Sequence, residues 1–188
     1  MPKFSYKKRD IQALVYLAQK DDIKALEELV RRVQKNIYAL FAHLVDKRED
    51  ISDLTQETLL KMAKSLPQLK DVTKFKSWLN QIATNNYYDY IKKNPHKYIE
   101  LSEEDFNEIK DKIGCGPGER CIFSEIERLV KIALQTLPLD LRITIVLREY
   151  EGLSYSEIAR ITNTAIGTVK SRISRARIKL QNELKEFI

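Results

Sequence analysis

The sequence is poor in the residues that interrupt helices. Among 188 residues there are only five glycines and five prolines, spread thinly along the chain. Because glycine and proline weaken or break helices, their scarcity favours a mostly helical protein. No stretch reaches the roughly 20 apolar residues that a membrane helix needs, so we expect no membrane insertion. The basic start is not followed by an apolar run, so we expect no secretory signal and a cytoplasmic protein.

Cysteine and histidine are also scarce. Cys115 and Cys121 lie six residues apart, and the only histidines, His43 and His96, are far from them and lack ligand spacing. We therefore expect no metal site and interpret the cysteines as reduced thiols, with a redox-sensitive pair as the alternative. The sequence contains no phosphate-cradling glycine loop, no paired carboxylates in a pocket motif and no nucleophile constellation. It predicts no catalytic residue, no cofactor and no enzymatic activity.

Charge is abundant and mixed in sign. Lysine and arginine number 33 against 27 aspartates and glutamates, which gives a net charge of +6. This balance suits an anionic partner, and a hydrophobic content of 43% is enough to build cores. No acid occurs from Ile158 to Asn182, so positive charge gathers near the C-terminal end.

Hydrophobic spacing divides the chain into two helical stretches. In the first we expect helices over residues 10–19, 22–43, 52–66 and 75–93, and in the second over 124–136, 139–149 and 153–161, followed by a last basic helix. Between them the pattern dissolves into acids and the loop composition GCGPG. The sequence therefore predicts an all-α fold. Two small helical domains, 10–93 and 124–188, are joined by a flexible linker over 94–123.

Residues 151–180 are typical of a helix-turn-helix. Val169, Ile173, Ala176 and Leu180 form one apolar stripe on the second helix. The polar face opposite this stripe and its flanks hold Ser171, Ser174, Arg175, Lys170, Arg172, Arg177 and Lys179. Such a helix can lie in the major groove, where its centre reaches base edges and its flanks contact phosphates. An ordinary solvated amphipathic helix is the alternative.

The third helix has one polar face that its core packing does not use. Asp53, Gln56, Glu57 and Leu60 follow one another at helical spacing. This face is either solvated surface or a docking site for a basic partner protein.

The fourth helix aligns groups that suit nucleic acid. Gln81, Asn85, Tyr88 and Lys92 fall at i, i+4, i+7 and i+11. Amide, aromatic and ammonium groups read or stack on bases and hold phosphate. Lys70, Lys74 and Lys76 add positive charge before the helix, whereas we interpret Phe75 and Trp78 as core residues.

Three segments resemble one family when they are taken together. DISDLTQETLLKMAKSL, FKSWLNQIATNNYYDYIKK and the stretch from LPLDLRITIVLREYEG to SRARIKL are similar, in order and spacing, to conserved parts of bacterial RNA polymerase sigma factors. The resemblance is to the extracytoplasmic-function (ECF) members of the sigma-70 family and covers about residues 25–93 and 129–184.

The resemblance implies partners and roles for particular residues. Core RNA polymerase would bind through the clamp helices of its largest subunit, at Asp53, Gln56, Glu57 and Leu60, and through the flap of its second-largest subunit. Single-stranded DNA of the −10 element would contact Leu69, Lys70, Lys74, Gln81, Asn85, Tyr88 and Lys92. Duplex DNA of the −35 element would contact Thr168, Lys170, Ser171, Arg172, Ser174, Arg175 and Arg177. An anti-sigma factor is a further candidate partner.

Two other interpretations remain open at this point. A helix-turn-helix regulator with an N-terminal sensor or dimerisation domain would explain residues 151–180, but would leave the Asp53 and Asn85 faces as coincidences. An enzyme with an accessory DNA-binding tail is the third. Because Lys92 and Lys93 stand where the family often has arginine, and because the loop SLPQLKDVTK is particular to this chain, the promoter sequence is not predicted.

Overall fold

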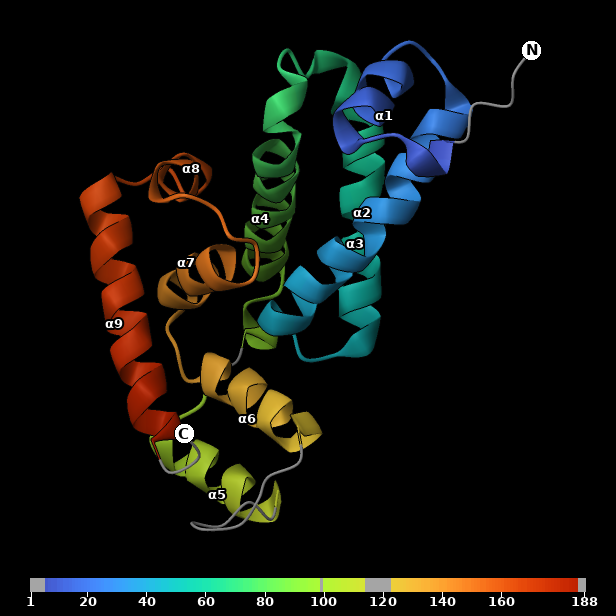
Figure 1. Cartoon of the computed structure of the whole chain (residues 1–188). Coiled ribbons are helices and arrows are strands. Elements are labelled where there is room, and N and C mark those ends of the chain that lie inside the picture. The colour runs from blue at the N-terminus through green and yellow to red at the C-terminus, as the bar shows by residue number, and fades with distance from the viewer. Residues whose placement is uncertain (1–5, 99, 114–122, 186–188) are drawn as a thin grey trace. The chain divides into compact units, whose positions relative to one another are not determined.

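The protein consists of two compact helical units. The computed structural model describes residues 6–98, 100–113 and 123–185, and the chain divides into Met1–Lys93 and Asn94–Ile188. Every regular element in the described ranges is a helix, as Figure 1 shows, which confirms the all-α prediction. None of the described helices is long and apolar enough to cross a membrane.

The first unit is built around three long helices that pack in chain order. Its elements are η1 (Tyr6–Lys8), α1 (Ile11–Ala18), α2 (Ile23–Leu44), α3 (Arg48–Ser65), η2 (Leu66–Gln68), η3 (Val72–Lys74) and α4 (Phe75–Lys93). Helix α2 packs against both α1 and α3, and α3 packs against α4. The core is lined by fully buried side chains such as Leu14, Leu29 and Phe41.

Side-chain caps fix where the first two helices begin. The carboxylate of Asp10 accepts from the Ala13 backbone N–H at 2.6 Å, and that of Asp22 accepts from Ala25 at 3.0 Å. These bonds satisfy amides that have no partner inside their own helix. Both helices therefore begin directly after a capping aspartate.

Helix α3 begins four residues earlier than its apolar pattern predicts. It starts at Arg48 instead of Ser52, and Glu49 and Asp50 occupy its first turn. Acidic side chains there are favoured by the partial positive charge of a helix N-terminus. A charged first turn has no hydrophobic periodicity, so the sequence pattern did not reveal it.

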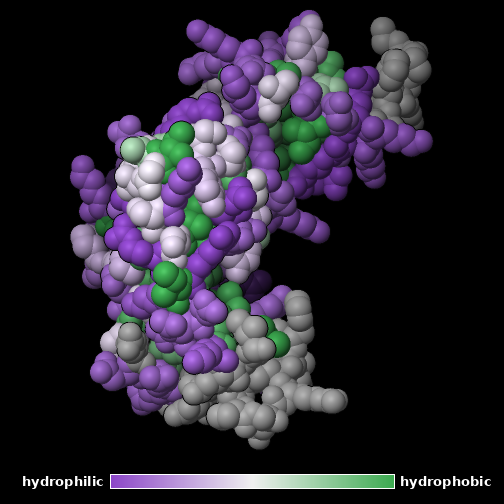
Figure 2. Space-filling model, turned by 60° about the vertical axis from the view of Figure 1, so that its left-hand side comes forward, coloured by the Kyte–Doolittle hydropathy of each residue, from purple (hydrophilic) through white to green (hydrophobic). Residues whose placement is uncertain are grey.

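The second unit contains five α-helices in its described part. Its elements are η4 (Pro95–Lys97), α5 (Glu103–Ile113), α6 (Phe123–Gln135), α7 (Leu139–Glu149), α8 (Tyr155–Ile161) and α9 (Ile166–Leu184). Helix α9 packs against α6, α7 and α8 (Figure 1). Hydrophilic side chains cover most of the face drawn in Figure 2, and apolar ones appear there in small separate areas.

The predicted linker is wrong over residues 101–113. Ser102 and Asp105 cap the start of α5 reciprocally, with N–H to oxygen distances of 3.0 and 3.1 Å. Phe106 is buried in a cluster with Leu129, Ala133 and Leu184, so α5 belongs to the core of the second unit. Acidic residues dominate this segment, and one buried aromatic is too little for a periodic pattern to show. Cys115 and Cys121 lie outside the described residues.

A tight turn and a capping box set up the helix-turn-helix. Gly152, between α7 and α8, has φ +65°, a conformation that costs glycine little and other residues more. Ser154 then caps α8 by accepting from the Glu157 N–H, while the Glu157 carboxylate accepts from the Ser154 N–H at 2.8 Å. Helix α8 therefore begins at Tyr155, two residues later than predicted.

Candidate functional site

The polar face of α3 is exposed as its spacing predicts. Asp53, Gln56 and Glu57 are all exposed, and 61% of Leu60 is exposed, whereas the opposite side of the helix is buried. The Nζ of Lys61 lies 2.9 Å from Glu57. The face therefore combines carboxylates with one uncovered apolar side chain, which suits a protein partner that brings cations and a shallow apolar contact.

A buried amide joins α3 to α4 directly behind this face. Asn86 donates to the Thr58 hydroxyl at 3.1 Å and to the Leu54 carbonyl at 3.3 Å. Its own Oδ1 accepts from Lys61 at 2.7 Å. Sequence reasoning missed Asn86, because the neighbouring Asn85 drew attention as the exposed amide.

Helix α4 buries more polar groups than its sequence interpretation allows. The buried polar side chains of the helix are Ser77, Asn80, Thr84, Asn86 and Tyr87. Ile82 and Tyr90, although apolar and aromatic, are only partly buried. The signal was present in the sequence, since Ser77, Asn80, Thr84 and Tyr87 fall at i, i+3, i+7 and i+10.

The outer side of α4 presents the predicted row. Asn85 and Lys92 are exposed, and Gln81 and Tyr88 are half-buried. Trp78, three residues before Gln81, is also half-buried, with its ring 6.0 Å from that of the buried Phe75. The core interpretation is therefore correct for Phe75 and only partly so for Trp78, whose exposed part extends the row by one aromatic group.

The loop between α3 and α4 presents one of its three predicted DNA contacts freely. Lys70 is exposed, whereas Leu69 is buried and Lys74 pairs with Asp71 at 3.2 Å. Hydrogen bonds from the Thr73 hydroxyl and N–H, and then from Lys74, hold the pKa of Asp71 below its usual value. Burial argues against direct DNA contact by the Leu69 side chain, which instead anchors the loop. A buried residue beside an exposed one in a loop follows no period, so the sequence did not separate them.

Helix α9 has the buried stripe and the exposed polar face that were predicted. Val169, Ile173 and Ala176 are buried, and Leu180 is partly buried. The residues expected to contact the −35 element divide by exposure. Lys170, Ser171, Ser174, Arg175 and Arg177 are exposed, and Thr168 and Arg172 are partly buried.

Two of the predicted DNA-binding arginines are engaged with α7 instead. Arg172, only 16% exposed, is paired with Asp140, and Arg177 donates twice to Glu149 at 2.6 and 3.1 Å. Lys179, on the same flank, donates to the Thr136 carbonyl at 2.8 Å. The three cations fasten α9 to neighbouring chain, which leaves Lys170 and Arg175 as the cations directed outward among the predicted set. Periodicity alone could not show this, because it says nothing about partners 28 or more residues away.

Family profiles match both units. The profile described as sigma-70 region 2 matches residues 29–96, and that described as sigma-70, region 4, matches residues 128–180. The α3, α4 and loop residues lie in the first match, and the helix-turn-helix lies in the second. The two matches thus contain all three candidate surfaces.

Curated relatives and solved structures agree with these profiles. The chain is 35% identical to the ECF RNA polymerase sigma-E factor of Haemophilus influenzae, over 94% of this chain and 96% of that protein. It is 33% identical to the protein of the same name from Escherichia coli K12, over 94% and 95% of the two chains.

Among solved structures, the sigma factor RpoE from Bartonella quintana, crystallised with the anti-sigma factor NepR, matches with a TM-score of 0.66 and 30% identity over 86% of this chain and 98% of that one. CnrH in complex with the cytosolic domain of CnrY shares the fold, with a TM-score of 0.68 and 23% identity over 95% of this chain and 100% of that one. The 35% identity to the Haemophilus influenzae sigma-E factor covers nearly the whole chain, and both conserved regions are present in order. The protein therefore belongs to the ECF sigma factors of the sigma-70 family, which direct transcription initiation and are not enzymes.

Proposed function

We propose that the three surfaces divide the work of promoter recognition among them. The α3 face, Asp53, Gln56, Glu57 and Leu60, binds the clamp helices of the largest subunit of core RNA polymerase. The outer row of α4 with Lys70 captures single-stranded −10 DNA, and α9 reads the −35 duplex. Because these partners meet on the chromosome, we place the protein in the cytoplasm.

The observation that carries this proposal is the exposure pattern of α3. Its carboxylates and Leu60 face outward although the rest of the helix is packed against α2 and α4. Leu60, 61% exposed, is one of several exposed apolar side chains, so it supports docking only together with the three polar groups beside it. An apolar contact with a polar rim is the arrangement found in protein interfaces.

Capture of melted DNA follows from the chemistry of the α4 row. Unstacking a base costs a few kcal/mol, so a surface that binds the unstacked base stabilises the open duplex. Asn85 can hydrogen-bond the edge of an unstacked base, which the loop around Lys70 helps to recognise and hold, and Lys92 can neutralise phosphates. The side chain of Leu69 is left out of this role because it is buried.

Reading of the −35 element falls to the outward groups of α9. Arg175 and Ser171 lie on the face opposite the buried stripe, and Lys170 lies beside them. A bidentate arginine contact to guanine discriminates between base pairs in the major groove. Arg172 and Arg177 serve DNA binding mainly by holding α9 in place. The second unit, which contains α9, is also our candidate for contact with the flap of the second-largest polymerase subunit.

The solved relatives suggest a regulator as well. RpoE from Bartonella quintana was crystallised with an anti-sigma factor, and we propose that this chain is controlled by a protein of the same class. Such a partner would inhibit by covering the surfaces that polymerase and DNA need.

Charge reversal on α3 tests the polymerase surface. In the double variant Asp53→Lys with Glu57→Lys, we expect affinity for core polymerase to fall by well over about 1 kcal/mol, because like charges then oppose each other at the interface. The measurement is titration of labelled protein with core enzyme, followed by run-off transcription. The single variant Asp53→Lys is measured beside the double variant. Its matched control is Glu27→Lys, a charge reversal at an exposed position on α2. Unchanged affinity of a folded double variant would show that polymerase docks elsewhere.

A further inference from the structure

A glutamine at the end of α1 holds the loop that precedes α4. The Nε2 of Gln19 donates to the backbone carbonyl of Leu66 at 2.9 Å and to that of Leu69 at 2.7 Å. Gln19 is the C-cap of α1, and its partners lie 47 and 50 residues further along the chain. One side-chain amide thus brackets the whole turn Leu66–Gln68.

The orientation of the Leu69 carbonyl determines the direction in which the chain enters Lys70. The peptide unit is planar, so the Leu69 C=O and the Lys70 N–H share one rigid plane. Fixing the carbonyl therefore fixes the direction in which the chain continues into Lys70. The side chain of Leu69 is buried, so both this side chain and the bond from Gln19 hold the loop.

The carbonyl of Leu66, the other group that Gln19 contacts, lies at the end of α3. Leu66 is the C-cap of α3, where the last carbonyls of the helix have no intrahelical donor. It accepts from the Leu69 N–H at 3.1 Å as well as from Gln19. Gln19 therefore ties the end of α3 to the loop, and α1 also packs against Val72–Lys74.

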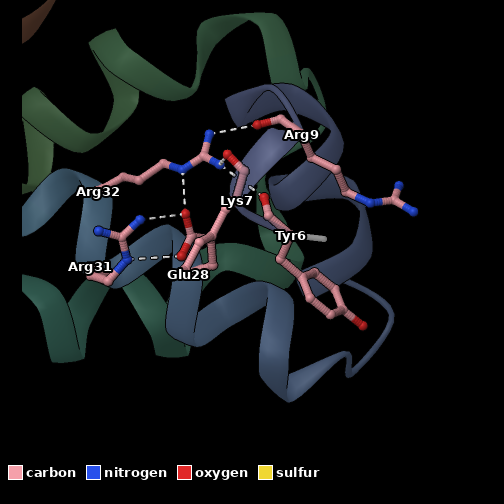
Figure 3. Close-up of polar contacts among 6 residues, drawn as sticks. All are labelled: Tyr6, Lys7, Arg9, Glu28, Arg31 and Arg32. Carbon is pink, nitrogen blue, oxygen red and sulfur yellow. Dashed lines mark hydrogen bonds and ion pairs between the residues drawn. The ribbon is translucent and has the colours of Figure 1, made fainter. Parts of the chain in front are cut away.

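Helix α1 is firmly anchored, so it can act as a support. Glu28 on α2 accepts from Arg31 and Arg32, and Arg32 donates to the carbonyls of Arg9, Tyr6 and Lys7 at 2.5, 2.8 and 2.9 Å (Figure 3). These bonds fasten the segment that leads into α1.

The other end of α1 is fastened through the α1–α2 turn. The Tyr6 hydroxyl donates to Asp22 at 3.0 Å, and Asp22 also caps α2. Gln19 lies between these two anchors, so its amide is presented to the loop from a fixed helix end.

We infer that Gln19 is a positioning residue for −10 recognition: it does not contact DNA, but sets the place from which Lys70 and the loop do. The inference rests on the proposed role of the loop and α4 in single-strand capture. It assigns to α1, which none of the three candidate surfaces includes, a part in base selection.

Base preference separates this role from a purely structural one. Holoenzyme would be mixed with a forked promoter library whose −10 strand is randomised, and bound sequences would be counted. Gln19→Glu keeps the shape but presents a carboxylate, which cannot donate, to two carbonyl oxygens. We expect the enrichment of the preferred base, at the −10 position that the loop around Lys70 contacts, to fall about tenfold. This is the change that about 1.4 kcal/mol produces.

Other substitutions at Gln19 set the expected order. Gln19→Ala removes both bonds and should lower the enrichment less than Gln19→Glu, whereas Gln19→Lys keeps a donor and should retain most of it. Polymerase affinity should stay at the wild-type value in each variant. The matched control is Gln12→Glu, an exposed glutamine on the same helix, which should leave the preference unchanged.

Two outcomes would decide against the inference in different ways. If Gln19→Glu and Gln19→Ala keep the wild-type preference while Asn85→Ala alters binding, Gln19 has no positioning role and the proposed capture surface stands. If Asn85→Ala also has no effect, the capture surface itself is wrong. Should Gln19→Glu unfold, shown by its circular dichroism melt, Gln19→Ala and Gln19→Lys carry the same comparison.

Discussion

Asn85 is the single residue whose substitution should separate DNA melting from polymerase binding. Its side chain is exposed on the outer row of α4 and belongs to a different helix from the α3 face. For Asn85→Ala we expect weaker open-complex formation with near-normal affinity for core polymerase, because only a base-edge contact is lost. A permanganate footprint of the promoter measures the melting. Asn36→Ala, an exposed asparagine on α2, is the control, and unaltered melting in Asn85→Ala would exclude base capture by this residue.

Glu28 gives the first unit a pH-dependent anchor. Hydrogen bonds from Arg31 and then Arg32 lower the pKa of Glu28 from its ordinary value of 4.5 to about 2. A carboxyl group whose pKa is lowered by folding stabilises the folded state above its ordinary pKa, and that contribution disappears as the pH falls toward the folded value. Glu28→Gln should therefore lower the melting temperature at pH 7, and the difference from wild type should shrink between about pH 4.5 and 2. A difference that is constant over this range would show that the anchor is not ionic.

Single residues also mark where prediction from sequence ended. The exposed face of Asp53 and the buried stripe of Val169 follow from helical period alone, and both are found. Leu69, Arg172 and Gln19 could not be interpreted in this way, because what they do depends on partners brought close by the fold. Helical spacing shows which way a side chain points, and not what it meets there.

At the scale of elements, α9 should show two kinds of arginine. Arg175 faces outward and we expect Arg175→Ala to cost about 1–3 kcal/mol and to relax preference at one position of the −35 element. Arg177 is paired with Glu149, so Arg177→Ala should weaken all sequences alike without changing preference. A duplex library measured over a salt series distinguishes the two. A uniform loss in both variants, with preference intact, would mean that α9 is not the base reader.

The pairing between α7 and α9 predicts an equivalent effect from the acidic partners. Asp140→Asn and Glu149→Gln leave the arginines in place but remove the charges that orient them. We expect a modest uniform loss of −35 affinity, within about 1 kcal/mol, because at least one partner of each pair is exposed to solvent. Removing an acid near DNA would by itself strengthen binding, so a gain in affinity would show that the pairs do not position α9.

Two elements show why the architecture was only partly predictable. Helix α9 has an unbroken apolar stripe, whereas α5 has one buried aromatic among acids and was mistaken for loop. Helix α4 was recognised, but its buried side is largely polar, and amides such as Asn86 are buried only because α3 offers them partners. Patterns of apolar residues predict helices that pack through apolar contacts. They do not predict which side chains are buried where two helices are joined by hydrogen bonds between polar groups.

At the scale of the whole molecule, the two units should contribute independently to promoter binding. Asn85 and Arg175 lie in different units with separate cores. Effects of distant substitutions add to within about 0.5 kcal/mol, so the double variant should lose the sum of the two single losses. Promoter affinity of the holoenzyme for wild type, both single variants and the double variant measures this. A markedly smaller or larger loss would mean that one unit's hold on DNA depends on the other's.

The docking of α5 also changes which part of the chain sets the reach between the two promoter elements. Residues 114–122, rich in glycine, lie between α5 and α6, and both of these helices belong to the second unit. The helices on either side of this segment therefore belong to the same unit, and the chain passes from one unit to the other at Lys93 and Asn94. Lengthening residues 114–122 should leave the tolerated spacing between the −35 and −10 elements unchanged, whereas the same insertion after Lys93 should broaden it. We therefore expect the residues around Lys93 and Asn94, and not the glycine-rich segment, to set the spacing between promoter elements that the protein tolerates.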